Sequence, residues 1–575
     1  MSFAKLKAAR QDKPSYVTSN PLPSQESSAV PSEGPIQSTK ESLYKSIPDH
    51  LQIRTSAVSG RGLWATKPCL PGQVLFAMKP HVAALSNERL ALHCSQCFGG
   101  GGNAGLKRCT QCQVVYYCDS TCQNLDWTFH KNECIALQRV AASGETAIPS
   151  DAIRCLGRIM WKRQKQGPAS PWTQEIDLLQ SHKQEVPPSA YELHTHLAIS
   201  LVRYLGLSSP SEIAAFGIAS GADLANFVSR FVTNTFTITD PSLAPLGASV
   251  SPPVALINHS CDPNAVVVFP RSRPNNQEPL MQVVALRDIS ANEEILTAYI
   301  DTTLPRAQRQ ASLRETYLFS CACTLCTSTQ PDLRDSVWCP KACGGVCPAP
   351  TEENSLSRCT QCLSALQKTD EVLDASRIGQ QALDKASLLQ FTDPAKSKQL
   401  CSKLIPILTS AGLTPSSHPL LALTRLYTAL LIADLQSSSP SQETLDEAVV
   451  CATKALAGLD GILRYGHPVR GIARAELGKL LAVDEPAPRP PAASAAEEAL
   501  RYPPSGAKRL RMALDVLLQA RGELNVGFGA PNEGGAVGRD VREDIVRLER
   551  ELGVWQKGLS EAMRDAKEAK ILQRS

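Results

Sequence analysis

The spacing of hydrophobic positions divides the chain into regions of different period. A strand-like region begins near Leu51. Apolar residues recur at helical spacing through residues 138–233, as in YELHTHLAISLVRYLGL. Short β-branched runs such as AVVVF and MQVVAL fill the stretch from Phe236 to Tyr299. The pattern therefore predicts strands, then a helical insertion, then a sheet.

Beyond residue 369 the chain reads as amphipathic helices joined by short turns. His467 and Pro468 are expected to start one of them, because proline in a first helical turn loses no hydrogen bond. Paired helices of this kind suggest a short array like tetratricopeptide repeats. Residues 1–46 are rich in Ser, Pro and Gln and are predicted to be disordered.

Charge and composition narrow the class of partner. The 575 residues hold 59 Lys and Arg against 55 Asp and Glu, a formal charge of +4, which gives no strong nucleic-acid signal. We expect no membrane span, since no apolar run reaches roughly 20 residues. The N-terminal sequence also has no apolar core like that of a signal peptide. The expected location is the cytoplasm and nucleus.

The 20 cysteines are gathered rather than scattered, mostly in residues 94–134 and 321–362. Close pairs of cysteines in a reducing compartment are more often metal ligands than disulfides. In the first cluster, four pairs separated by two or three residues supply eight ligands, enough for two closed tetrahedral zinc sites. These ligands are Cys94, Cys97, Cys109, Cys112, Cys118, Cys122, His130 and Cys134.

Three separated segments carry an enzymatic signal. The first is SGRGLWA, with Gly60, Arg61 and Gly62, where glycines permit a backbone turn close to a ligand. The second is ALINHSCDPNAVVVF, and the third is ALRDISANEEILTAYID, which contains Tyr299. Alone, the first signal is weak and Tyr299 would be read as a core residue. The three together, in this order, resemble the SET methyltransferases.

The cysteine cluster with CQNLDWTFHKNEC resembles a MYND finger, and the combination resembles the SET-and-MYND (SMYD) family of protein lysine methyltransferases. The resemblance implies an α+β fold: a SET β-fold with an inserted MYND zinc finger and a helical insert, a post-SET zinc site and a C-terminal α-helical, tetratricopeptide-like domain. The expected parts are a disordered segment 1–46, the start of SET 47–92, the finger 93–137, the insert 138–233, the SET core 234–300, post-SET 301–328, a cysteine-rich zinc element 329–368 and the helical domain 369–575.

The resemblance also implies roles for individual residues. It pairs the finger's ligands in an interleaved way: Cys94, Cys97, Cys118 and Cys122 on one zinc, and Cys109, Cys112, His130 and Cys134 on the other. It makes Tyr299 the catalytic hydroxyl. It places S-adenosylmethionine against Gly60, Arg61, Gly62, Asn258, His259, Tyr317 and Phe319, and a protein substrate's lysine near Asn234, Thr235 and Phe236.

Three positions depart from the family pattern. Asn292 stands where glycine is common, and asparagine tolerates a left-handed turn. Ser59 stands where a basic residue is common. The family has an acidic cofactor contact in the helical insert, and it is expected to fall near Gln180. An uncharged glutamine at that position would lower the affinity for the cofactor.

The second cluster predicts two more sites. Cys321, Cys323 and Cys326 need a fourth ligand, and Cys261 is the natural donor for a post-SET zinc. Two further pairs, about 16 residues apart, resemble a zinc ribbon that would hold a fourth zinc. They are Cys339, Cys343, Cys359 and Cys362, with Cys347 able to replace Cys343.

The leading hypothesis is an S-adenosylmethionine-dependent lysine methyltransferase acting on histone or non-histone proteins. The alternative is an adaptor, active in transcriptional regulation, that has lost catalysis and binds partners through its finger and helical domain. Proline-rich peptides are candidate partners of the finger. Retention of Asn258, His259 and Tyr299 favours the enzyme.

Overall fold

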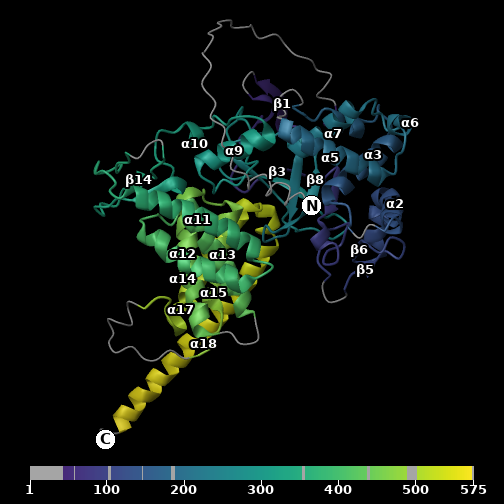
Figure 1. The fold of residues 1–575 in the computed structure, drawn as a ribbon. Helices are drawn as coiled ribbons and strands as arrows, with labels where there is room; N and C mark the ends of the chain where they lie inside the picture. Colours follow the sequence, from purple (N-terminus) through teal and green to yellow (C-terminus); the bar gives the residue numbers. More distant parts are fainter. Residues whose placement is uncertain are drawn as a thin grey trace.

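The computed structural model is an α+β protein with a strand-rich N-terminal part and a C-terminal body of packed helices (Figure 1). It describes residues 43–56, 59–101, 105–144, 147–182, 188–352, 356–436, 441–487 and 501–572. The predicted disordered segment therefore falls almost wholly outside the described residues. Tyr44, near its end, is buried.

Four small sheets build the N-terminal part. β1 (Leu51–Ser56) pairs antiparallel with β2 (Gly60–Ala65). The next two sheets have the orders β10 (Ala265–Val268), β11 (Met281–Ala285), β3 (Val74–Met78) and β4 (Val82–Leu85), β8 (Pro245–Val250), β7 (Thr235–Thr239). The fourth pairs β9 (Asn258–His259) with β12 (Leu296–Thr297) in parallel. In the two three-stranded sheets, strands from 47–92 thus pair with strands from 234–300.

The finger and the helical insert lie in the chain between β4 and β7. The finger has β5 (Lys107–Arg108), β6 (Tyr116–Tyr117) and α2 (Ser120–Ala142), whose N-cap Asp119 accepts from the Cys122 amide. The insert holds α3 (Asp151–Gln166), α4 (Pro171–Asp177), α5 (Pro188–Leu205), α6 (Pro210–Ala214) and α7 (Gly221–Thr233). Because α2 continues past residue 137, one helix joins the finger to the insert.

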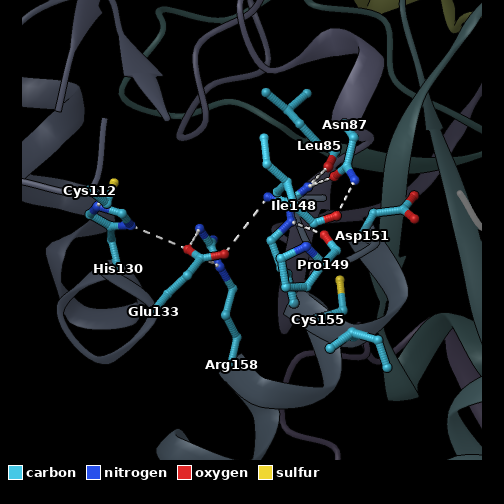
Figure 2. Close-up of polar contacts among 12 residues, drawn as sticks. Leu85, Asn87, Cys112, His130, Glu133, Ile148, Pro149, Asp151, Cys155 and Arg158 are labelled. Carbon is cyan, nitrogen blue, oxygen red and sulfur yellow. Dashed lines mark hydrogen bonds and ion pairs between the residues drawn. The ribbon is translucent and has the colours of Figure 1, made fainter. Parts of the chain in front are cut away.

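A buried ion cluster fastens the finger to the insert (Figure 2). Arg158 of α3 contacts Glu133, with Nε 3.0 Å from Oε2, and Asp126, with a guanidinium nitrogen 3.1 Å from Oδ1. It also donates to the Ala83 carbonyl of β4 at 3.1 Å. Burial alone would raise the pKa of Glu133, but Arg158 and His130 lower it overall. The Glu133 carboxylate therefore stays charged and paired inside the protein.

The helical body follows a post-SET segment with α9 (Arg306–Tyr317) and α10 (Thr324–Thr327), and a hairpin of β13 (Ser336–Trp338) and β14 (Val346–Pro348). Its helices are α11 (Thr369–Leu389), α12 (Pro394–Ser410), α13 (His418–Leu435), α14 (Gln442–Ile462), α15 (Pro468–Ala482), α17 (Gly506–Gly527) and α18 (Gly535–Leu572). Successive helices pack on one another, and α15 begins at Pro468 with His467 as its N-cap, as predicted.

The remaining elements are α8 (Pro252–Ala255) and three 3-10 turns, η1 (Asn87–Arg89), η2 (Leu333–Asp335) and η3 (Ala530–Asn532). Through η3 the helical body contacts the SET sheet, where the Asn532 amide donates to Gln282 of β11 at 2.7 Å. Within the described part of the chain, no helix has both the length and the apolar character needed to cross a membrane.

We expect Arg158→Met to destabilise the protein by about 3–5 kcal/mol, because Glu133 and Asp126 would stay buried without their cation. Zinc affinity at the His130 site should fall about 10–100-fold, since Glu133 orients that ring. Urea unfolding followed by tryptophan fluorescence and a zinc titration would measure both. Arg377→Met is the control, because Arg377 pairs with Asp374 at an exposed site and should change little. Equal stability of the two variants would contradict the prediction.

Candidate active site and zinc centres

The parallel pair β9–β12 brings the second and third sequence segments together. Thr297 of β12 lies opposite His259, and the Ser260 amide donates to the Thr297 carbonyl at 2.9 Å. His259 Nδ1 accepts from the Tyr299 amide at 3.0 Å, while Nε2 lies 3.3 Å from Cys261 Sγ. Burial lowers the pKa of His259 to about 4, so the ring is neutral and its proton sits on Nε2. Both ring nitrogens are thus used within the protein.

Tyr299 lies in a cluster of aromatic rings. Its ring centroid is 5.2 Å from that of His259, 4.9 Å from that of Tyr317 and 6.4 Å from that of Phe319. The Tyr317 hydroxyl donates to the Tyr299 carbonyl at 3.1 Å. Burial raises the pKa of Tyr299, which keeps its phenol protonated. That phenol donates to the Ile257 carbonyl at 2.6 Å, so two oxygens are fixed side by side.

A cavity of about 240 Å³ opens beside this phenol. Its lining contains all three residues of the predicted substrate segment, Asn234, Thr235 and Phe236, together with Tyr299 and Tyr317. Asn234 is the C-cap of α7, and the other two begin β7. The turn from the last insert helix into the sheet therefore delivers this segment to the tyrosine. Among the described residues that line the cavity there is no carboxylate.

Residues Gly60–Gly62 of β2 lie against Asn258, which belongs to the second sequence segment. The Asn258 amide donates to the Arg61 carbonyl at 3.1 Å and to Glu294 Oε1 at 2.7 Å. A Cβ on Gly62 would lie 2.3 Å from that same Oε1, so a larger residue there would displace the Glu294 side chain. Gly60 has φ +69°, a conformation that favours glycine. The first and second segments thus meet, as expected.

Gln180 lies next to this segment. Its side-chain nitrogen would be 3.9 Å from a Cβ on Gly60, and its carbonyl accepts from the Asn234 amide at 2.8 Å. Arg61 reaches the same turn and donates to the Leu178 carbonyl at 2.6 Å. A cofactor contact at Gln180 remains a prediction, but the residue is in the expected neighbourhood.

Two residues at the site were missed by the sequence analysis. Glu294 bonds Asn258, and its only signal was its place in ANEEILTAY. His467, more than 160 residues beyond Tyr299, lines the cavity from the helical body, and its signal was the GHPVRG sequence. Asn292 has φ 65°, which confirms the left-handed turn expected there.

The finger brings its eight ligands together as two groups in the interleaved pairing that was expected. Zn–S bonds of about 2.3 Å in a tetrahedron put sulfurs about 3.8 Å apart. The Cys97 and Cys118 sulfurs lie 3.6 Å apart, and those of Cys109 and Cys134 lie 3.9 Å apart. His130 presents Nε2 to the second group, at 3.6 Å from Cys112 Sγ. Both groups therefore have the spacing of closed structural zinc sites.

The post-SET group also meets as predicted: Cys261, Cys321, Cys323 and Cys326. The sulfurs of Cys326 and Cys261 lie 3.5 Å apart. Cys261 follows the strand β9, whereas the other three follow α9 and Phe319. The group therefore ties the aromatic residues Tyr317 and Phe319 to Asn258 and His259. Cys339, Cys343, Cys359 and Cys362 form a fourth group, and Cys347 is not among its members.

Comparison with known proteins agrees with this geometry. Residues 94–134 match the model of the MYND finger family. The chain is 31% identical over 287 residues to N-lysine methyltransferase SMYD2-B of Xenopus laevis, with 50% of this chain and 62% of the relative covered. It is 34% identical over 289 residues to histone-lysine N-methyltransferase ASHR1 of Arabidopsis thaliana, with 48% and 56% covered. This chain is therefore similar to SET-and-MYND proteins over about half of its length.

The similarity to these proteins covers only part of each of them. The chain spans about three fifths of the length of these relatives, including N-lysine methyltransferase SMYD2 of Mus musculus, at 31% identity with 48% of this chain and 60% of the relative covered. A crystal structure of the SET domain of LSMT bound to lysine and AdoHcy covers 88% of both chains at 11% identity, but the TM-score of 0.29 is too low to bear on the fold.

We expect Cys261→Ser to lose one equivalent of zinc and to bind S-adenosylmethionine more weakly, because the post-SET group would no longer tie Phe319 to the strand of Asn258. Zinc analysis and calorimetry would measure the two effects. Cys401→Ser is the control, since Cys401 is a buried cysteine of the helical body outside every thiol group and should keep its zinc. A Cys261→Ser protein with its full zinc content would exclude Cys261 as a ligand.

Proposed function

We propose that this protein is a protein lysine N-methyltransferase that uses S-adenosylmethionine. The observation that carries the proposal is the surroundings of Tyr299, which lines a cavity together with Phe236 and Tyr317 and whose phenol donates to the carbonyl of Ile257, the residue before Asn258. The similarity to an N-lysine methyltransferase and to a histone-lysine N-methyltransferase supports the same reaction class. Histone and non-histone proteins are both candidate substrates.

The residues present fit the cofactor. Gly60 and Gly62 carry no side chain of their own beside Arg61, while Asn258 and Glu294, which lie against Gly62, supply an amide and a carboxylate. The rings of His259, Tyr317 and Phe319 lie close to Tyr299, and aromatic faces stabilise a cation such as a sulfonium. When bound, the cofactor supplies an electrophilic methyl group.

The cavity favours the reactive form of the substrate. A lysine amine has a pKa of about 10.4 in water, and only its neutral form can attack a methyl group. The described residues that line the cavity include Phe236, Tyr299 and Tyr317 and no carboxylate, so an ammonium that leaves water for this cavity gains no counter-ion and is disfavoured by desolvation. The amine's proton therefore leaves to solvent before transfer, and the walls then hold the side chain in line.

Tyr299 and Ile257 then orient the reacting atoms. Since the phenol donates its proton to the Ile257 carbonyl, its lone pairs are left to accept a hydrogen bond from the amine. The two oxygens can also accept weak C–H contacts from a methyl group. Fixing the amine at a short distance supplies much of the rate, because an oriented encounter avoids most of the entropic cost.

The proposed metal centres have a structural role: they hold the finger and the post-SET segment in place. We propose that the finger holds two zinc ions and the post-SET group holds one, each with four protein ligands and no open position. We also propose that the finger binds proline-rich peptides, with Leu125, Trp127 and Ile135 exposed on α2 as contacts. The proposed location is the cytoplasm and nucleus, where thiolate ligands stay reduced.

We expect Tyr299→Phe to lower kcat for peptide methylation by about 10²–10³-fold, because one oriented oxygen is lost, and to leave the Kd for S-adenosylmethionine nearly unchanged. Transfer of labelled methyl groups to a peptide array, and calorimetry, would measure the two quantities. Tyr427→Phe, a buried tyrosine of the helical body, is the control. Equal kcat in Tyr299→Phe would remove this hydroxyl from the mechanism. A zinc-loaded wild type that fails to bind the cofactor would favour the adaptor.

His467 offers a second test. Its Nδ1 accepts from the Val469 amide at 3.3 Å, and burial lowers its pKa to about 4, so the neutral ring carries its proton on Nε2. We expect this group to donate to the substrate's backbone. His467→Asn keeps a good N-cap but loses the donor. KM for a peptide should rise about 10-fold with kcat unchanged. His196→Asn, on the exposed part of α5, should behave as wild type, and equal KM values would contradict the role of His467.

A further inference from the structure

Residues 332–352 and 356–366 form an element that contacts both the SET part and the helical body. We call it the ribbon. It begins at η2 with Arg334, which is 5% exposed. Arg334 Nε donates to the Thr302 carbonyl at 2.5 Å, three residues beyond Tyr299 in sequence, and its terminal nitrogen donates to the Ile462 carbonyl of α14 at 2.7 Å. One buried guanidinium thus joins the two parts of the protein.

The strand that follows continues the link. β13 pairs with β14 on one edge. On its other edge the Trp338 amide donates to the Gly412 carbonyl at 2.8 Å, and Val337 forms a bridge with Leu413. The Ser417 hydroxyl, at the start of α13, donates to the Ser336 carbonyl. The turn between α12 and α13 therefore acts as a third strand of the ribbon.

Four thiols hold the outer end of this small sheet. The sulfurs of Cys339 and Cys362 lie 3.5 Å apart, as do those of Cys343 and Cys359. Each distance is close to the roughly 3.8 Å of a tetrahedral zinc site and far from the roughly 2.0 Å of a disulfide. All four ligand atoms lie within 4.8 Å of one another.

The backbone around the thiols is arranged for thiolates. The Gly345 amide points at Cys343 Sγ and the Gln361 amide at Cys359 Sγ, both at 3.4 Å. The post-SET group has the same kind of contact, from the Cys323 amide to Cys321 Sγ at 3.4 Å. A Cβ on Gly345 would lie 2.7 Å from Cys359 Sγ, so a side chain there would push the two loops apart.

We propose that Cys339, Cys343, Cys359 and Cys362 bind a Zn²⁺ ion, and that this zinc makes the ribbon a brace that sets how the helical body meets the SET part. Little apolar surface is available inside so short a hairpin, so the metal supplies its folding energy. Without the metal, β13 loses its partner β14, and the contacts to Gly412 and Leu413 loosen with it.

The brace bears on the substrate cavity. A cavity of about 350 Å³ at the junction is lined by Thr302, Arg334, Ile462 and His467, and His467 also lines the cavity beside Tyr299. A shift of the helical body would therefore move His467 relative to the phenol. This consequence rests on the proposed function, whereas the zinc site and the brace do not.

The test counts metal in the full-length protein by mass spectrometry. We expect four zinc equivalents in the wild type and three in Cys359→Ser/Cys362→Ser. Cys347→Ala is the matched control, because Cys347 lies on β14, is fully buried and stands outside the thiol group. It should keep four. The proposed zinc site would be excluded by four zinc equivalents in the double variant or by three in the wild type. Iron in place of zinc would exclude it as well.

Hydrogen exchange tests the brace without relying on catalysis. In the double variant, exchange should rise in residues 411–417 and 460–467 and stay unchanged in the finger. Unchanged exchange in both stretches would overturn the brace. If the double variant does not fold, a chelator titration of the wild type replaces it. The first zinc equivalent released should come from this site, where Cys362 is exposed, and should raise exchange in 411–417. Release from the finger first, with 411–417 unchanged, would overturn the proposal.

For substrate, we expect the double variant to show a higher KM for peptide and an unchanged Kd for S-adenosylmethionine. If the wild type methylates no peptide, the proposed function fails, but the zinc count and the exchange still decide the brace. If the wild type is active and the double variant has the same KM, the effect on the substrate cavity is excluded.

Discussion

The arrangement of the site depends on two residue pairs between parallel strands, Asn258 with Leu296 and His259 with Thr297. This parallel contact is short, yet it joins segments separated by a strand hairpin and leaves little freedom in the angle between them. His259 extends the contact, because one ring nitrogen takes the Tyr299 amide and the other faces Cys261. A charged imidazole could not accept that amide, so the burial that keeps the ring neutral is part of the same constraint.

Thiol groups stabilise the small parts of this protein, as buried apolar side chains stabilise larger domains. The finger, the post-SET segment and the ribbon are each too small to hold a core of their own. Each instead joins pieces of chain that are distant in sequence: Cys261 meets cysteines some 60 residues later, and Cys97 meets Cys118. The rings of Tyr317 and Phe319 take their place only because the chain is anchored a few residues beyond them.

Local spacing explains which features the sequence alone could predict. All sixteen predicted metal ligands fall into the four expected groups, since each pair lies on one turn and zinc demands a fixed geometry. The start of the helical body at Thr369 and the left-handed Asn292 also follow from local patterns. Tyr299, Asn258 and Phe236 were found through family resemblance, and the structure brings them to one place.

What could not be predicted depends on contacts across the fold. Nothing near Glu294 indicates that it meets Asn258, because a carboxylate in a turn is usually solvated. His467 looks like an ordinary helix cap, and only the contact of the loop before α15 with the SET part, where Arg464 pairs with Asp262, brings it to the cavity. The continuation of α2 beyond residue 137 was missed because the boundary followed the last cysteine, whereas helices end where caps and packing allow.

That continuous helix has a consequence for the finger as a module. Its inner face carries Glu133 and Asp126, which both pair with Arg158 of the insert. Arg158 in turn donates to the Ala83 carbonyl of β4. Excising the finger would leave that buried arginine without Glu133 and Asp126, the carboxylates that pair with it. Although its zinc sites are self-contained, the finger is not a detachable unit, and evolution could exchange it only together with the helix that follows.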